Sequence, residues 1–221
     1  MRKRKYIFAD KGTNRHLFPT IAIANELKKR VPNAEILFLG TKDKIEASVV
    51  PKSGYGFSPI WISGLHRKKI ISNILLPLKI IVSVMQSLSK IKSFSPDVVI
   101  GTGGYVAGPV VYAGTLLGKP TIIQDQNSIP GITTRLLGKR VNEVHLTFEA
   151  AKKYLRRKDN IVMSGNPTRG KLETSDINAA AGFFGFDAQD RRRTLLVFGG
   201  SLGAKKHERG YACCYRKIAG E

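Results

Sequence analysis

The chain has 221 residues, 42% of them hydrophobic, which suits one sizeable folded domain or about one and a half and excludes wholesale disorder. Its formal net charge of +21 calls for an anionic partner: nucleic acid, an anionic membrane or a phosphorylated substrate. The adjacent Cys213 and Cys214 near the end of the chain cannot form a useful disulfide staple or a metal site. We therefore expect a protein without disulfides, bound metal or cofactor.

Short β-branched runs alternate with helical patterns along the chain, which is typical of βαβ units on a parallel sheet. A helix is predicted over residues 17–30, where apolar positions recur at helical spacing. Strands are predicted at residues 6–9, 36–39, 57–62, 97–100, 121–123, 144–146 and 160–163. This order predicts an α/β fold, a Rossmann-like doubly wound parallel sheet, over residues 1–168.

A linker and the beginning of a second domain are predicted after this sheet. Residues 169–193 form the linker, which includes a possible short helix at 178–184, and residues 194–198 read as a buried strand before a glycine loop. Only 17 residues follow that loop at 205–221, fewer than the roughly 30 of a complete βαβ unit. We expect the domain of residues 194–221 to be begun and not completed, with an aberrant tail.

The positive charge is concentrated in one stretch, because no acidic residue lies between Glu46 and Asp97. The basic residues there alternate with aliphatic side chains, whereas nucleic-acid binders pair them with stacking aromatic rings or a recognition helix. They are Lys52, Arg67, Lys68, Lys69, Lys79, Lys90 and Lys92. This composition favours an anionic membrane surface as the partner, and we expect no nucleic acid.

The chain offers no apolar run of the roughly 20 residues that a membrane-spanning helix takes. Its basic amino terminus, Met1–Lys5, is followed by a short strand and not by a signal-peptide core. We therefore expect a peripheral protein on the cytoplasmic side of the cell inner (plasma) membrane.

Three loops with glycines follow predicted strands, at residues 10–16, 101–109 and 199–204. Glycine lets the backbone approach a ligand and turn its amides toward an anion at the start of a helix. One such cluster is as often a tight turn, but three at strand ends favour a phosphate-bearing ligand, because open α/β sheets bind ligands there.

These loops also carry a family resemblance. The matching motifs are Thr13 with His16–Pro19, Leu39–Thr41 with Glu46–Ala47 and Val50–Pro51, Ile62–Leu65, Gly103–Pro109, Asp125–Asn127 with Pro130–Gly131 and Thr134–Arg135, Gly165–Arg169, and Gly199–Ala204. In this order and spacing, from about residue 5 to residue 204, the chain resembles the MurG family. The resemblance implies the amino-terminal half of a two-domain GT-B glycosyltransferase. That family transfers N-acetylglucosamine from UDP-N-acetylglucosamine to lipid I, the undecaprenyl-pyrophosphoryl-linked N-acetylmuramyl pentapeptide, giving lipid II for peptidoglycan and cell wall synthesis.

The resemblance also implies roles for single residues. Contacts to UDP-N-acetylglucosamine are implied for Thr13, Asn14, Arg15, Asn127, Arg169 and Ser201. His16 matches a histidine proposed to assist catalysis, and it titrates near neutrality as a general base for the attacking hydroxyl should. Gly103, Gly104 and Tyr105 belong to the loop implied for the acceptor and its phosphates.

Simpler alternatives remain open for these residues. Asn127 can instead cap the turn before Pro130, Arg169 can be a solvated linker arginine, and His16 can cap the first helix. Tyr105 suits packing better than chemistry.

The chain departs from the family pattern in its first loop, where Lys11, Asn14 and Arg15 replace three glycines. Side chains there fill space and hinder close backbone approach. Together with the incomplete second domain, this predicts that the chain alone does not transfer sugar at a useful rate. The alternative function is a non-catalytic module that binds the membrane or lipid I. A nucleic-acid-binding protein is a third alternative, which lacks any recognisable motif.

Overall fold

The computed structural model describes residues 3–10, 14–64, 74–167, 176–183 and 185, without the side chains of 14–16, 177, 180 and 181. The chain divides into two compact units, residues 1–173 and 174–221. The second contributes one described helix, α6 (Ile177–Phe183), close to the short helix predicted there. The strand predicted at 194–198 and its glycine loop lie outside the described residues, and the predicted domain boundaries stay predictions.

In the first unit, strands alternate with helices throughout. The strands are β1 (Lys5–Ala9), β2 (Glu35–Gly40), β3 (Gly56–Pro59), β4 (Val98–Gly101), β5 (Thr121–Asp125), β6 (Glu143–Leu146) and β7 (Ile161–Met163). The helices are α1 (Asn14–Arg30), α2 (Glu46–Lys52), α3 (Leu76–Phe94), α4 (Gly104–Leu116), α5 (Ile132–Leu137) and the 3-10 helix η2 (Glu149–Tyr154). All seven strands predicted between residues 6 and 163 are present.

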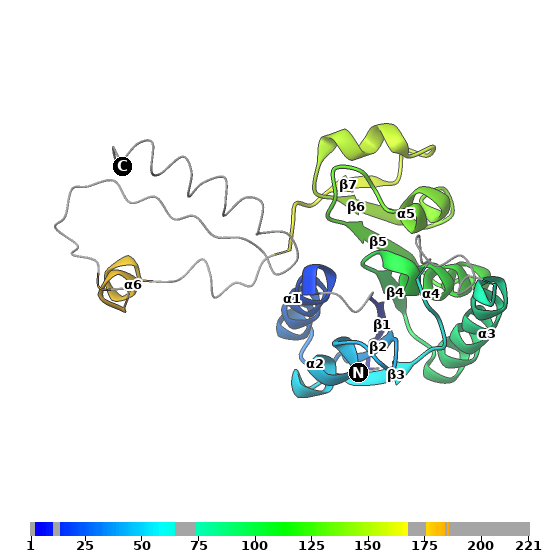
Figure 1. The fold of residues 1–221 in the computed structure, drawn as a ribbon, viewed down its shortest axis with the longest axis horizontal. Coiled ribbons are helices and arrows are strands. Elements are labelled where there is room, and N and C mark those ends of the chain that lie inside the picture. The colour runs from blue at the N-terminus through cyan, green and yellow to red at the C-terminus, as the bar shows by residue number, and fades with distance from the viewer. Residues whose placement is uncertain (1–2, 11–13, 65–73, 168–175, 184, 186–221) are drawn as a thin grey trace. The chain divides into compact units, whose positions relative to one another are not determined.

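The seven strands form one sheet in the order β3-β2-β1-β4-β5-β6-β7, and every neighbouring pair is parallel. The winding reverses between β1 and β4, so α1 and α2 cover one face and α3 and α4 the other (Figure 1). This confirms the doubly wound, Rossmann-like α/β fold. Ala9 pairs with both Leu39 and Gly101, so β1, β2 and β4 end level and their loops open at one edge.

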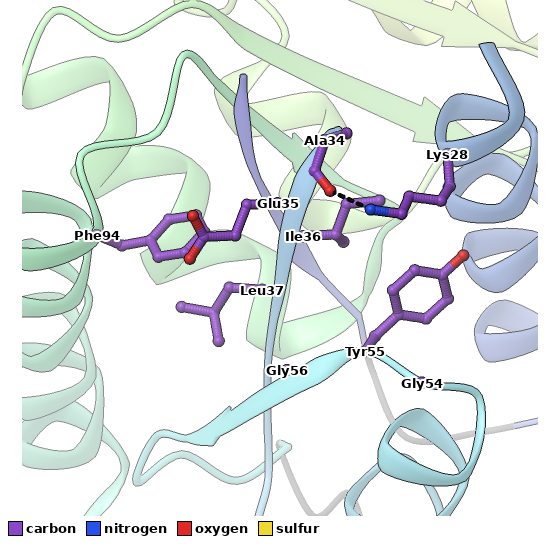
Figure 2. A pocket seen from close by; sticks show the side chains of 9 residues that line it. All are labelled: Lys28, Ala34, Glu35, Ile36, Leu37, Gly54, Tyr55, Gly56 and Phe94. Carbon is purple, nitrogen blue, oxygen red and sulfur yellow. Dashed lines mark hydrogen bonds between the residues drawn. The ribbon is translucent and has the colours of Figure 1, made fainter. Parts of the chain in front are cut away.

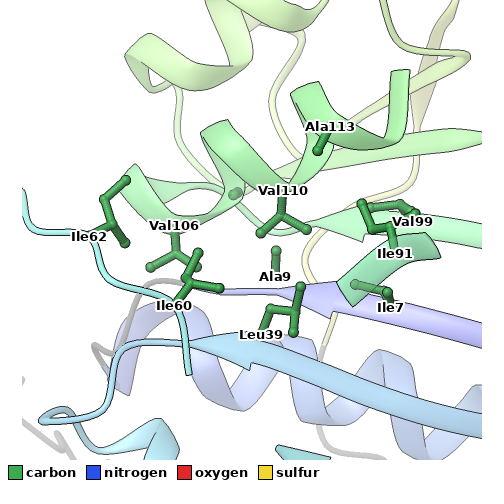
Figure 3. Packing of buried hydrophobic residues seen from close by; sticks show 11 residues of the cluster. Ile7, Ala9, Leu39, Ile60, Ile62, Ile91, Val99, Val106, Val110 and Ala113 are labelled. Carbon is green, nitrogen blue, oxygen red and sulfur yellow. The ribbon is translucent and has the colours of Figure 1, made fainter. Parts of the chain in front are cut away.

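The core lies on both faces of the sheet because neighbouring residues of a strand point in opposite directions. Ile7 and Ala9 of β1 join the cluster beneath α3 and α4, in which Val106 and Val110 are fully buried (Figure 3). Phe8 points the other way and stacks on Phe38 of β2, with ring centroids 5.2 Å apart. Helices therefore shield both faces, and the loop-bearing edges of the sheet are left for ligands.

Two predicted boundaries are wrong by three residues, and other strand ends differ by one or two. The first helix begins at Asn14, three residues before the predicted start at 17, because residues 14–16 are polar and add nothing to the apolar periodicity. The third strand ends at Pro59 and not at residue 62. Ile60 still donates its N–H to Gly40, but the N–H of Trp61 turns to the side chain of Gln86 in α3. The segment thus leaves the sheet and runs toward α3.

Helix α3 buries Ser83, Ser87 and Ile91 and exposes several aliphatic side chains. Ser83 and Ser87 are fully buried, and each hydroxyl donates to a carbonyl oxygen of its own helix. The exposed large side chains in and just before α3 are Ile74, Leu75, Leu78, Ile80, Ile81 and Met85, at 45–73% exposure. Within the part of the chain that is described, no helix has both the length and the apolar character needed to cross a bilayer.

Candidate acceptor cleft

A cleft of about 1220 Å³ opens at the carboxyl ends of the strands. Its base comes from residues at the ends of four strands: Thr41 after β2, 61–64 after β3, 103–105 after β4, and Asp125 at the end of β5 with Asn127 after it. Helices α3, α4 and α5 provide the walls. Ligands of open α/β sheets bind at this edge, as the sequence predicts.

The glycine loop after β4 forms part of the base of the cleft. Gly103 has φ 96° and ψ −177°, and Gly104 has φ 78°, conformations that residues with a Cβ rarely adopt. Helix α4 begins there, so its first backbone amides lie at the cleft, at the positive end of the helix dipole. This arrangement can bind a phosphate without any charged side chain.

Tyr105 follows these glycines, and its side chain serves both packing and the cleft. The ring packs on the core cluster shown in Figure 3 and against Gly64, where a Cβ would lie 2.9 Å from Tyr105 Cδ1. The hydroxyl is hydrogen-bonded to Thr41. Burial raises the pKa of the Tyr105 phenol, the hydrogen bond with Thr41 acts to lower it, and the negative charge of Glu46 adds to the increase. The packing interpretation thus describes the ring, while the phenol remains a candidate for binding.

Asp125 organises the loop that carries Asn127. Its buried carboxyl group accepts hydrogen bonds from Asn127 N at 3.0 Å and Nδ2 at 2.9 Å on Oδ1. On Oδ2 it accepts from Gly131 N at 2.9 Å and Thr134 Oγ1 at 2.6 Å. Asp125, rather than Asn127, therefore closes the turn before Pro130. Asn127 lines the cleft with its amide held by Asp125, which leaves the carbonyl oxygen to accept from a ligand.

Basic side chains from α3 and α5 border the cleft. Lys79 Nζ donates to Ser63 Oγ at 3.1 Å and lies 5.6 Å from the ring centroid of Trp61. Lys44 and Arg135 also line the cleft. The sequence singled out Lys79 only as part of a basic stretch, because nothing local indicates that α3 turns it toward the cleft. These cations favour an anionic ligand.

Buried threonines tie the start of α1 to the same edge of the sheet. Thr20 Oγ1 of α1 lies 2.7 Å from Thr102 Oγ1, and Thr102 also donates to Asp10 Oδ1 at 3.2 Å. Thr102 directly precedes Gly103, so α1 is anchored beside the glycine loop. Among the described residues, no three His, Cys, Asp or Glu side chains are placed to hold a metal ion.

A second cavity of about 330 Å³ lies at the amino ends of β2 and β3, the opposite edge of the sheet (Figure 2). Lys28 Nζ donates there to the carbonyl oxygen of Ala34 at 2.7 Å. Tyr55 turns its hydroxyl to Asn25 Oδ1 at 2.6 Å. The polar groups of Lys28 and Tyr55 are thus already hydrogen-bonded within the protein. We therefore interpret this cavity as a structural feature and not as a ligand site.

The profile of the glycosyltransferase family 28 N-terminal domain matches residues 6–146, a range that contains β2 to β6, all of β1 except Lys5, and every residue lining the cleft. The chain belongs to this family.

Relatives of known function agree with this assignment. The chain is 43% identical over 208 residues to the UDP-N-acetylglucosamine–N-acetylmuramyl-(pentapeptide) pyrophosphoryl-undecaprenol N-acetylglucosamine transferase of Flavobacterium psychrophilum, covering 93% of this chain and 56% of the relative. It is 43% identical over 193 residues to the enzyme of the same name from Salinibacter ruber, covering 87% of this chain and 51% of that protein. The chain thus spans about half the length of the curated relatives it matches.

Solved structures point the same way. The crystal structure of Acinetobacter baumannii MurG superposes with a TM-score of 0.70 at 25% identity, covering 93% of this chain and 55% of that one. This similarity and the curated relatives confirm the resemblance to the MurG family. A structure of S. aureus MnaA with UDP matches at a TM-score of 0.55 and 14% identity, which shows a shared fold alone.

The structure brings together some of the predicted site residues of this family member. Gly103, Gly104, Tyr105 and Asn127 all line the cleft. Asn14, Arg15 and His16 form the first turn of α1, so His16 lies inside the helix and not at its cap, while their side chains lie outside the described part. Thr13, Arg169 and Ser201 also lie outside the described residues. Roles for these ten residues stay predictions.

Proposed function

We propose that this chain provides the acceptor-binding domain of a transferase that moves N-acetylglucosamine from UDP-N-acetylglucosamine to lipid I, giving lipid II. The observation that carries the proposal is the cleft itself. A glycine loop with positive φ angles opens it at the start of α4, and Lys79 and Arg135 border it. The curated relatives are named for an acceptor that contains a pyrophosphoryl group. Such an anion suits both the backbone amides of the glycine loop and the cations at the border of the cleft.

The acceptor lies in the cleft with its diphosphate at the amides of the glycine loop. An acceptor hydroxyl attacks the anomeric carbon of N-acetylglucosamine, a new glycosidic bond forms, and the bond to the diphosphate breaks with UDP as the leaving group. His16, in the first turn of α1, takes the proton of that hydroxyl as a general base. A single displacement of this kind inverts the anomeric centre and needs no covalent enzyme intermediate.

The nucleotide sugar is the second substrate. Asn127 accepts a hydrogen bond from one of its hydroxyl groups, because Asp125 occupies the amide of Asn127 and leaves the carbonyl oxygen for the ligand. Thr13, Asn14, Arg15, Arg169 and Ser201 complete the contacts to UDP-N-acetylglucosamine. Since the chain spans about half the length of its curated relatives, we propose that it binds acceptor but turns over little by itself.

Helix α3 provides the contact with the membrane that delivers the lipid-linked acceptor. Its exposed side chains Leu78, Ile81 and Met85 can enter the acyl boundary, and Lys90 and Lys92 follow on the same helix. Each basic side chain near an anionic leaflet adds about 1 kcal/mol of attraction. We place the protein peripherally on the cytoplasmic side of the plasma membrane.

Two measurements on the 221-residue chain separate the transferase from a binding module. Flotation with vesicles that contain phosphatidylglycerol and a lipid I analogue tests binding, and labelled UDP-N-acetylglucosamine tests transfer. Flotation without turnover supports acceptor binding by this chain, and turnover equal to that of a full-length relative contradicts our view that the chain binds only. If the chain does not float with these vesicles, the proposal that the cleft binds the acceptor loses its support.

A further inference from the structure

The part of the cleft beyond the glycine loop is an apolar groove, which the proposed reaction does not use. Helix α4 contacts both α3 and α5, and all three helices line the cleft, so α4 forms the floor between two walls. Val106, Val110 and Ala113 of α4 pack on the core beneath the helix (Figure 3). Gly108 and Tyr112 lie on its other side and line the cleft. The groove therefore follows α4 from its start toward its end.

Aliphatic side chains form the walls of this groove. Leu76, Ile80 and Val84 recur every four residues along α3, so they lie on one face of that helix, and all three line the cleft. From α5, Ile132 and Leu136 line the cleft with the same spacing, and they are 63% and 65% exposed. Both walls thus present apolar surface to solvent.

The three helices around the groove carry no acidic residue. The Thr133 hydroxyl already donates to the carbonyl oxygen of Gly104 at 2.8 Å. Lys79 Nζ donates to Ser63 Oγ, away from the floor of the groove. A hydrocarbon ligand between these helices therefore displaces water from apolar surface without removing a helical carboxylate from water.

The groove and the candidate diphosphate site meet at the start of α4. Gly104 begins this helix with φ 78°, and the first helix amides suit a phosphate. Tyr112 follows two turns later, on the order of 12 Å along the axis at about 1.5 Å per residue. A ligand with an anionic end at the glycine loop and a hydrocarbon chain along α4 fits both parts of this one cleft.

We propose that the groove binds the first isoprene units of the lipid-linked acceptor, so that the hydrocarbon chain leaves the diphosphate along α4 between α3 and α5. The chain then continues to the outer face of α3, where Leu78, Ile81 and Met85 are exposed. The identity of the lipid rests on the proposed function, whereas the apolar character of the ligand rests on the lining of the groove.

A series of diphosphates with increasing chain length tests the groove. Inorganic pyrophosphate and dimethylallyl, geranyl and farnesyl diphosphate, each below its micellar concentration, are titrated into the 221-residue chain by calorimetry. We expect farnesyl diphosphate to bind about tenfold tighter than dimethylallyl diphosphate or better, because each further isoprene unit buries apolar surface. The heat-capacity change on binding should become more negative along the series. Equal affinity along the series, or no binding by any member, overturns the proposal.

Substitutions in the two walls locate the hydrocarbon chain. Ile80 and Leu136 are 45% and 65% exposed, so Ile80→Gln with Leu136→Gln changes the groove without changing the core. We expect this double variant to weaken farnesyl diphosphate about tenfold and to leave pyrophosphate binding within about twofold. Ile80→Leu with Leu136→Ile keeps the apolar surface and should retain the affinity for farnesyl diphosphate.

Val162→Gln is the matched control, because Val162 is an exposed aliphatic residue of β7 that does not line the cleft. We expect it to change the affinity for neither probe. Farnesyl diphosphate binding that the double variant leaves unchanged, or that Val162→Gln weakens equally, overturns the proposal.

The groove and the diphosphate site can fail separately. If pyrophosphate binds and added isoprene units contribute nothing, the groove is refuted and the diphosphate site stands. If farnesyl diphosphate binds and the double variant weakens it, but pyrophosphate does not bind, the groove stands and the diphosphate site does not. Sedimentation tests a second copy of the chain as the occupant. A dimer that the double variant dissociates, and that farnesyl diphosphate leaves intact, overturns the proposal.

Discussion

Replacing Asp125 by asparagine tests the loop that presents Asn127. The Asp125 carboxyl group is 2% exposed and accepts four hydrogen bonds of 2.6–3.0 Å, two on each oxygen. Asparagine keeps one oxygen and places an NH2 group in the other position, where it faces two further donors. Either orientation therefore breaks two bonds and leaves buried donors without a partner.

Each lost bond of this kind costs about 1–2 kcal/mol after relaxation, so we expect Asp125→Asn to lower the free energy of unfolding by about 2–4 kcal/mol. Asp125→Ala loses all four bonds and should cost about 3–5 kcal/mol. These are large fractions of a typical domain stability of about 5–15 kcal/mol.

Urea unfolding of the first unit measures these changes, with circular dichroism and the fluorescence of Trp61, the single tryptophan, as two probes. Asp159→Asn is the matched control, since Asp159 is exposed and pairs with Arg157 at 2.8 Å on the surface. We expect the control to leave the unfolding midpoint essentially unchanged, because solvent screens an exposed ion pair. A loss of stability in Asp125→Asn as small as that in Asp159→Asn would refute the hydrogen-bond account of this loop.

Three further changes test other parts of the structure. Gly101→Ala places a Cβ 2.6 Å from Val111 Cγ2, and we expect overpacking to cost about 1–3 kcal/mol in urea unfolding. The pKa of Tyr105 is raised in the folded state. Its contribution to stability is therefore present below its ordinary pKa of about 10 and is lost as the pH rises through the folded value. Unfolding curves at alkaline pH measure this loss. Ile81→Gln with Met85→Gln removes exposed aliphatic surface from α3 and should weaken vesicle binding about tenfold in flotation.

Each of these changes has a control within the chain. Gly182→Ala adds a Cβ with no atom within 4 Å and should cost nothing, so an equal loss there contradicts the packing argument for Gly101. Tyr105→Phe should abolish the part of the alkaline loss that Tyr105 causes, and an unchanged curve assigns it elsewhere. Val162→Gln alters an exposed residue of β7 and should leave vesicle binding intact if α3 makes the contact.

The sheet was predictable because each strand is short, β-branched or apolar, and bounded by glycine, proline or polar residues. A parallel sheet buried on both faces produces such runs directly in the sequence. The β1 segment is an example, since Phe8 and Ile7 are both fully buried although they face opposite sides. Periodicity alone missed the start of α1, where Asn14 and Arg15 add no apolar position.

The cleft was predictable in position and only partly in chemistry. Strand ends and glycines indicated Gly103 and Gly104, because their backbone requirement is local. Lys79 and the Thr41–Tyr105 pair were not recognisable, since each depends on contacts between segments far apart in the sequence. The role of Asp125 depends on donors up to nine residues away, which a motif match does not reveal.

The most direct test of the acceptor cleft compares substitutions at two glycines that both have a positive φ angle. Gly103 (φ 96°) lies in the cleft, whereas Gly118 (φ 63°) lies just beyond the end of α4, and a Cβ there meets no atom within 4 Å. The dissociation constant of a soluble, short-chain lipid I analogue is measured for the chain and for each variant. We predict about tenfold or greater weakening by Gly103→Ala, through strain of about 1–3 kcal/mol at the binding amides, and little change by Gly118→Ala. Equal binding by both variants and the original chain, or no binding by the original chain, would contradict the account.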